Sequence, residues 1–146
     1  MHRFTATNVP FKVKAVWDHD KKGHFKTTYH SNLLPFSCPP DFGGIDNPSP
    51  EDLFLVSIGT CTLTTILHIC DSLRTLPEAL AITVGAEINK DKNGIYHFSE
   101  ITVEIDAYGE EFLLQRACEL APKYCLVVKS IKPSVFYVIT VNGTKI

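Results

Sequence analysis

The sequence predicts a single α+β domain built from hairpin strands and one long buried helix. Several short segments alternate apolar and polar residues between turn residues, which is typical of β-strands. The segment from Leu53 to Cys70 contains no Lys, Arg, Asp or Glu and follows a helix-start signal. The chain has 146 residues, which is enough for one domain with its own core.

The first elements are a predicted hairpin and a long loop. Phe11–Trp17 alternates apolar and polar side chains as a strand does, Asp18–Gly23 is a polar turn, and Phe25–Ser31 is the expected return strand. Leu33–Pro50 contains five prolines and a Gly-Gly pair, so we expect a loop. A loop of this length in a small domain is often functional.

The long helix is expected from Pro50 to about Leu73. Pro50 suits the first helical turn, and Glu51 and Asp52 favour the positive end of the helix dipole. Pro77 follows the expected end. The apolar stretch is close to the length of a membrane span. It carries several hydroxyl side chains, and no basic cluster sets a topology, so we favour a buried helix in a soluble protein.

The apolar residues of this helix point in all directions, so it must be covered on every side. The remaining strands and the second helix can cover one side only. We therefore predict an obligate homodimer in which a second copy of the chain covers the other side of this helix.

The second half of the chain predicts two strands, a helix and a final strand. The expected strands are Leu80–Asn89 and Tyr96–Ala107, joined by the turn Asp91–Gly94. An amphipathic helix is expected at Glu110–Ala121, broken by Pro122, with a short helical stretch after Cys125 and a last strand at Val135–Val141.

Composition excludes several classes of function. The net charge is −2 and no Lys/Arg cluster exceeds two residues, which argues against a nucleic-acid or anionic-membrane surface. The five cysteines lack metal-ligand spacing and suit neither a zinc site nor a disulfide framework, so we expect no metal and no cofactor. Met1–Pro10 has no apolar stretch, and we expect a cytoplasmic protein with reduced thiols.

Cys61 lies within the apolar helix, where Cys70 falls on the opposite face and cannot pair with it. Thr64, Thr65 and His68 lie on or near the face of Cys61 and offer hydrogen bonds to a thiolate. The simpler interpretation is that the threonines bond back to helix carbonyls and that His68 is a core histidine.

Cys125 precedes a helical stretch, and a helix N-terminus lowers the pKa of a thiol and raises its reactivity. Cys118 is expected to pack within its helix, and Cys38 to lie in a loop. On the residues alone, a redox role for Cys61 and Cys125 competes with the simpler role of small buried hydrophobes.

Two segments resemble a known family. They are Asn47–Thr62, which reads NPSPEDLFLVSIGTCT, and Ala117–Cys125, which reads ACELAPKYC. They resemble the central-helix motif and the second cysteine motif of the OsmC/Ohr superfamily of osmotically inducible and organic hydroperoxide resistance proteins. Pro-Ser-Pro with a following acidic residue, and then Gly-x-Cys-Thr, is most similar to the less characterised OsmC-like branch. With the order of elements, the resemblance covers nearly the whole chain.

The resemblance implies an OsmC-like fold, in which antiparallel strands wrap around a long central helix in an intertwined homodimer. It also implies a cysteine-based peroxidase that reduces organic hydroperoxides to alcohols in oxidative stress defence. By position, Cys61 is the peroxidatic thiol and is oxidised to a sulfenic acid. Cys125 then forms a disulfide with it, which an external dithiol reduces. Dimer assembly supplies a dry pocket suited to an apolar peroxide.

The resemblance also assigns a catalytic acid. Members that reduce hydroperoxides hold the thiolate with an arginine, which is positioned by a glutamate ten residues before the cysteine. Glu51 has this spacing, whereas Asp52 matches the OsmC-like branch and would face away from Cys61, so we expect Glu51 to be catalytic. The matching arginine is absent, because the chain contains only Arg3, Arg74 and Arg116. The candidate replacements are Lys12, Lys14 and Lys26.

The alternative function is a non-catalytic binding or sensing protein on the same dimeric scaffold. Its helix-lined pocket would hold an apolar small molecule, and Cys61 would be a small core residue. A structural dimer without small-molecule activity is a third interpretation.

Overall fold

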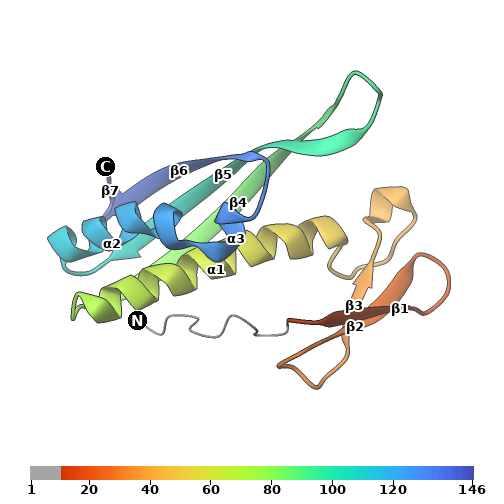
Figure 1. Ribbon diagram of the computed structural model, residues 1–146, viewed down its shortest axis with the longest axis horizontal. Helices are drawn as coiled ribbons and strands as arrows, with labels where there is room; N and C mark the ends of the chain where they lie inside the picture. The colour runs from red at the N-terminus through yellow and green to blue at the C-terminus, as the bar shows by residue number, and fades with distance from the viewer. Residues whose placement is uncertain (1–10) are drawn as a thin grey trace. The chain divides into compact units, whose positions relative to one another are not determined.

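The computed structural model describes residues 11–146 (Figure 1). The expectation of no secretory leader concerns Met1–Pro10, and this segment, including Arg3, lies outside the described residues. The chain divides into two compact units. Their boundary falls within the long helix α1 (Pro50–Ser72), between Phe54 and Leu55.

The amino-terminal unit contains the predicted hairpin. Strand β1 (Val13–Trp17) pairs with β2 (Lys22–Thr27) in antiparallel register, with Ala15 opposite Phe25. The return strand therefore begins and ends earlier than the expected Phe25–Ser31. The turn between the strands is shorter than expected as well.

The expected loop Leu33–Pro50 contains two short elements. Strand β3 (Leu34–Ser37) pairs with β2, and the 3-10 helix η1 (Pro40–Phe42) follows it. The prolines of this segment pointed to a loop, but β3 is an edge strand, where Pro35 removes no hydrogen bond that the sheet needs.

A capping box starts α1. The backbone N–H of Asp52 donates to Ser49 Oγ at 3.1 Å. The Asp52 carboxylate accepts from the Ser49 backbone N–H at 2.9 Å and from its hydroxyl at 3.0 Å. These bonds, the backbone one first, lower the pKa of Asp52. The predicted helix start is confirmed.

The carboxy-terminal unit holds a four-stranded sheet in the order β4-β5-β6-β7. Its strands are β4 (Ala79–Lys90), β5 (Tyr96–Tyr108), β6 (Ser134–Val141) and β7 (Thr144–Lys145). The predicted hairpin of β4 and β5 is confirmed, and Gly94 takes φ +78° in its turn. Strands β5 and β6 run parallel, whereas we expected antiparallel strands. A helical connection between them carries the chain back to the end of the sheet where β5 begins.

That connection contains α2 (Glu111–Tyr124) and α3 (Leu126–Lys129). The expectation that Pro122 breaks the helix is wrong, because α2 continues through it to Tyr124. Proline removes one backbone donor, and here the loss falls in the last turn, where few further bonds depend on it. The Cys125 N–H then donates to the Ala121 carbonyl at 2.9 Å and closes the helix.

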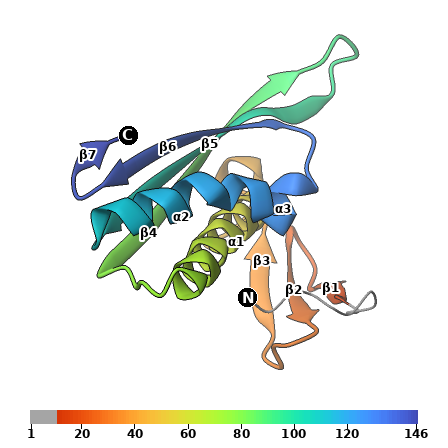
Figure 2. The ribbon, with the colours of Figure 1, turned by 60° about the vertical axis from the view of Figure 1, so that its left-hand side comes forward.

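The core of this unit lies between one face of the sheet and the helices α1 and α2 (Figures 1 and 2). Alternate residues of β5 are buried on this face: Ile101, Val103, Ile105 and Ala107. Gly59 of α1 packs close to β4, since a Cβ atom at this position would lie 3.1 Å from Val84 Cγ2. The sheet and α1 therefore approach each other closely, two residues before Cys61.

Helix α1 is not buried on every side within one chain. It buries a stripe formed by Ile58, Thr62, Ile66 and Ile69. On another stripe, Val56 is 54% exposed and Leu67 is 36% exposed. By length and composition alone α1 could also cross a membrane, but the core helix of a soluble protein passes the same test.

Candidate functional site

The structure brings together the two thiols that the sequence singled out. Cys61 lies in the middle of α1 and is half-buried, and Cys125 is fully buried at the junction of α2 and α3. Both are free cysteines, and Cys61 lies close enough to Cys125 for its side chain to influence the pKa of the Cys125 thiol. Because Cys61 and Cys125 both lie in the carboxy-terminal unit, this interaction is internal to it.

Thr62 is a third member of the site. Its hydroxyl donates to the Ile58 carbonyl at 2.8 Å and lies 3.8 Å from Cys125 Sγ. The side chain is fully buried, so the helix carbonyl holds the hydroxyl in a fixed position against the thiol. The sequence pointed to the hydroxyls of Thr64 and Thr65 and did not predict that Thr62 joins the site.

The pKa of the Cys125 thiol is raised, chiefly because burial disfavours the thiolate. The hydrogen bond and the charge interaction with Cys61 raise it further, whereas bonds from the Val128 backbone and from Thr62 lower it. The expectation of a depressed pKa is therefore wrong. Helix α3 has only four residues, and its N-terminus does not compensate for the lost solvation. Cys125 keeps its proton and can donate it toward the Cys61 sulfur.

Tyr137 on β6 also belongs to this site and was not anticipated. Its hydroxyl is buried and has no hydrogen-bond partner among the described residues. Burial raises the pKa of Tyr137 to about 12, with smaller contributions from the charges of Cys125 and Cys61. In the sequence, both faces of Val135–Val141 are apolar, so the alternation could not show which way Tyr137 points.

The other polar side chains expected near Cys61 have different roles. Thr64 donates to the Thr60 carbonyl at 2.9 Å, and Thr65 donates to the Cys61 carbonyl at 2.7 Å, which confirms the simpler interpretation. His68 is exposed rather than in the core, because it lies on the side of α1 that the single chain leaves uncovered.

The remaining cysteines are free thiols with other surroundings. Cys118 is fully buried in α2, as expected for a packing residue, and burial raises its pKa to about 11. Cys70 is buried as well, and burial raises its pKa. Cys38 is half-buried beside η1.

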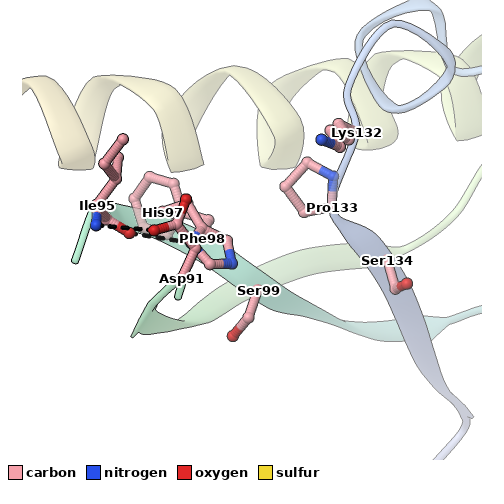
Figure 3. Close-up of a pocket in the computed structure, with 8 residues that line it drawn as sticks. All are labelled: Asp91, Ile95, His97, Phe98, Ser99, Lys132, Pro133 and Ser134. Carbon is pink, nitrogen blue, oxygen red and sulfur yellow. Dashed lines mark hydrogen bonds between the residues drawn. The ribbon is translucent and has the colours of Figure 1, made fainter. Parts of the chain in front are cut away.

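A hollow at the end of the β4–β5 hairpin is a separate feature (Figure 3). It has a volume of about 520 Å³ and is lined by residues that include Asp91, His97 and Lys132. The Asp91 carboxylate accepts from the backbone N–H groups of Asn93 at 2.8 Å and Ile95 at 3.0 Å. This acid therefore holds the hairpin turn, and the hollow contains no thiol.

Comparison with known proteins identifies the family. The family model described as OsmC-like protein matches residues 43–139, which is more than half of the chain. The chain belongs to the OsmC-like family. No curated protein sequence matches it significantly.

Solved structures share the OsmC-like fold along most of the chain. An OsmC-like protein of unknown function from Vibrio cholerae has a TM-score of 0.79 at 15% identity. The match covers 91% of this chain and 100% of the Vibrio cholerae chain. An organic hydroperoxide resistance protein from Elizabethkingia anophelis has a TM-score of 0.73 at 19% identity, covering 92% and 96%. The organic hydroperoxide resistance protein OhrB of Bacillus subtilis has a TM-score of 0.67 at 17% identity, covering 91% and 98%. At these identities the likeness shows the shared fold alone.

The acid expected in this OsmC-like chain lies in the first turn of α1. Glu51 is exposed, and its carboxylate has no ion pair or hydrogen bond within residues 11–146. Its neighbour Asp52 is engaged in the capping box, which gives that acidic position a structural role. A catalytic role for Glu51 remains a prediction.

The candidate cations are spread over the chain. Arg74 and Arg116 are exposed, and no cation is among the groups that shift the pKa of Cys125 or Tyr137. The candidate lysines Lys12, Lys14 and Lys26 line one hollow of about 380 Å³ in the amino-terminal unit. The described groups that lower the pKa of Cys125 are therefore neutral hydrogen-bond donors, the Val128 backbone and Thr62.

Proposed function

We propose that this OsmC-like protein is a cytoplasmic thiol peroxidase that reduces organic hydroperoxides to alcohols in oxidative stress defence. Membership of the family supports a redox or stress role. The observation that carries the proposal is that the free thiols of Cys61 and Cys125 lie in one unit, close enough for Cys61 to influence the pKa of Cys125. Hydroperoxide resistance proteins from Elizabethkingia anophelis and Bacillus subtilis share the fold.

Cys61 is the peroxidatic thiol in this proposal. It is half-buried, so a substrate can reach it, whereas Cys125 has no exposed surface. The Cys61 thiolate attacks the distal oxygen of the hydroperoxide, forming an S–O bond as the O–O bond breaks, and the alkoxide leaves with the electron pair and takes up a proton. The sulfur becomes a sulfenic acid.

Cys125 is the resolving thiol. It attacks the Cys61 sulfenic acid, a disulfide forms and water leaves. An external dithiol then reduces the disulfide by thiol–disulfide exchange, which returns both thiols to the reduced state. The influence of the Cys61 side chain on the pKa of Cys125 supports this step, because it requires the two side chains to be near each other.

The proposed active form is a homodimer. The exposed apolar residues of α1, among them Val56 and Leu67, are the surface that a second copy would cover. Covering them would also create the dry surroundings that suit an apolar peroxide. Glu51 would act in this assembly through a cation, which a lysine or the second copy would supply.

The test is the oxidation of the reduced protein by tert-butyl hydroperoxide, followed by mass spectrometry of the intact chain and its peptides. We expect a Cys61–Cys125 disulfide at stoichiometric peroxide, and a Cys61 sulfenic acid, about 16 Da heavier, in Cys125→Ser. The matched control Cys118→Ser retains both site thiols and should still form the disulfide. An unoxidised Cys61 in the native protein would contradict the proposal.

A binding or sensing protein for an apolar small molecule is the second candidate. It is favoured by the absence of a cation among the groups that shift the pKa of Cys125, since hydrogen bonds alone then offset the effect of burial on this thiolate. Native mass spectrometry of freshly purified protein distinguishes the two candidates. A bound lipid-like molecule with no peroxide turnover supports binding, and a ligand-free mass with rapid turnover supports the peroxidase.

A further inference from the structure

The direction of Tyr137 follows from the register of the central sheet. Tyr137 pairs with Val103 of β5, and Val103 pairs with Val84 of β4. Paired residues on neighbouring strands point to the same face of a sheet. Val103 is fully buried and Val84 contacts the Gly59 position of α1, so this face is the one that the helices cover. Tyr137 therefore points toward the helices.

The row Val84, Val103 and Tyr137 passes beneath the part of α1 that carries the reactive thiol. Gly59 lies over its first member, and Thr62, three residues further along the helix, lies 3.8 Å from Cys125 Sγ. The phenol and the two thiols belong to the same unit and are close enough for the charges of both thiols to influence the pKa of Tyr137.

The phenol hydroxyl is not within hydrogen-bonding distance of either sulfur. It is buried, and no described group donates to it or accepts from it. An unsatisfied buried hydroxyl destabilises the fold, so its retention calls for an explanation. A small oxygen-containing group between the phenol and the thiols would satisfy it.

We propose that Tyr137 is a further catalytic residue, which donates its phenolic proton to the leaving oxygen of the hydroperoxide while Cys61 attacks the distal oxygen. This role rests on the proposed peroxidase function. The S–O bond forms and the O–O bond breaks, and the leaving alkoxide accepts the phenolic proton and becomes an alcohol. The proton that the Cys61 thiol loses on ionising restores the phenol. The net change converts one thiol and one hydroperoxide into one sulfenic acid and one alcohol.

The phenol suits this role chemically. With its pKa raised to about 12 it stays protonated at neutral pH and is available as a donor. An alkoxide is a stronger base than a phenolate and therefore takes the proton. No cation is among the described groups that shift the pKa of Cys125. A neutral donor of this kind would instead stabilise the negative charge that develops on the leaving oxygen in the transition state.

The test compares the rates at which Cys61 reacts with three electrophilic reagents in Tyr137→Phe and in the native protein. We expect its oxidation by tert-butyl hydroperoxide to slow about 10- to 100-fold, because a poor leaving group needs the proton. Peroxybenzoic acid releases a carboxylate, which leaves without a proton, so its rate should change by less than about threefold. Alkylation of Cys61 by iodoacetamide breaks no O–O bond and should proceed at the native rate.

The control variant is Tyr108→Phe, which removes an exposed phenol from the end of β5. It should react like the native protein with all three reagents. Tyr137→Phe loses only a hydroxyl that has no protein partner, so we expect it to fold with undiminished thermal stability. Equal rates for Tyr137→Phe and the native protein, or equal slowing with all three reagents, would overturn the role of Tyr137. A native protein that reacts with neither peroxide would instead contradict the peroxidase function itself.

Discussion

The thiols of Cys118 and Cys125 are both fully buried, and burial raises the pKa of both. Their surroundings differ in one respect. Cys125 lies against a threonine hydroxyl and its pKa is influenced by the Cys61 thiol, whereas the pKa of Cys118 is shifted by burial first and then by the charges of Cys70 and Glu119. A high pKa is thus a general result of burial in this core, and the partner thiol marks the reactive position.

The raised pKa of Cys118 predicts a loss of stability at alkaline pH. Below pH 9 the thiol is protonated in both the folded and the unfolded chain. Between its ordinary pKa of 9.0 and the folded value of about 11, only the unfolded chain ionises. The unfolded chain then binds fewer protons, so the free energy of unfolding should fall by roughly 1–3 kcal/mol over this range.

Denaturant titrations between pH 8 and pH 11 measure this dependence. We expect the free energy of unfolding of Cys118→Ala to fall less steeply at alkaline pH. At neutral pH the variant should be about 1 kcal/mol less stable, because the substitution leaves a small cavity. Cys38→Ala retains the buried thiol and should follow the native profile. An unchanged slope in Cys118→Ala would show that its thiol does not titrate in this way.

At the scale of elements, Gly59 determines how closely α1 can approach the sheet. A Cβ atom there would lie 3.1 Å from Val84 Cγ2, and the branches of a larger side chain would extend further toward β4. Gly85 is adjacent to Val84 on β4 but faces open space, with no atom within 4 Å of its Cβ position. The same substitution can therefore be made at a closely packed glycine, Gly59, and at a glycine that faces open space, Gly85.

We expect Gly59→Val to lower the free energy of unfolding by about 1–3 kcal/mol, because an overpacked side chain must displace α1 or β4. The control Gly85→Val should be neutral or slightly stabilising, since valine favours a strand more than glycine does. Chemical denaturation of both variants measures the difference. Equal stabilities would mean that α1 can move away from the sheet without cost.

At the scale of the whole molecule, the exposed apolar stripe of α1 supports a homodimer. Val56 and Leu67 lie eleven residues apart, which is about three helical turns, so they share one side of the helix. A soluble protein rarely leaves a contiguous apolar surface on its longest helix open to water. The dimer remains a prediction that the structure of one chain does not test.

Light scattering coupled to size exclusion should give about 33 kDa, twice the 16.3 kDa of one chain. Val56→Asp places a charge on the expected contact surface, and we expect it to dissociate the dimer or lower its stability by several kcal/mol. Leu76→Asp alters an exposed apolar residue beyond the end of α1 and should leave the mass unchanged. A native protein of 16.3 kDa in solution would contradict the dimer.

Most elements of the fold could be predicted from the sequence because their signals are local. The capping box of Ser49 and Asp52, the apolar run of α1 and the hairpin turn at Gly94 depend on residues a few positions apart. The short strand β3 and the continuation of α2 through Pro122 could not be predicted in this way. Each depends on where the residue lies in the finished structure, at a sheet edge or in a last helical turn.

The sequence by itself determined the elements, the family resemblance and the choice of Cys61 and Cys125, because periodicity, turn residues and motif spacing are properties of the chain. Only the tertiary structure decided that the two thiols lie near each other, that the pKa of Cys125 is raised, and that Thr62 and Tyr137 join the site. The physical reason is that desolvation and sheet register depend on groups distant in the sequence. Burial outweighed the helix N-terminus at Cys125, and pairing with Val103 turned Tyr137 toward the helices.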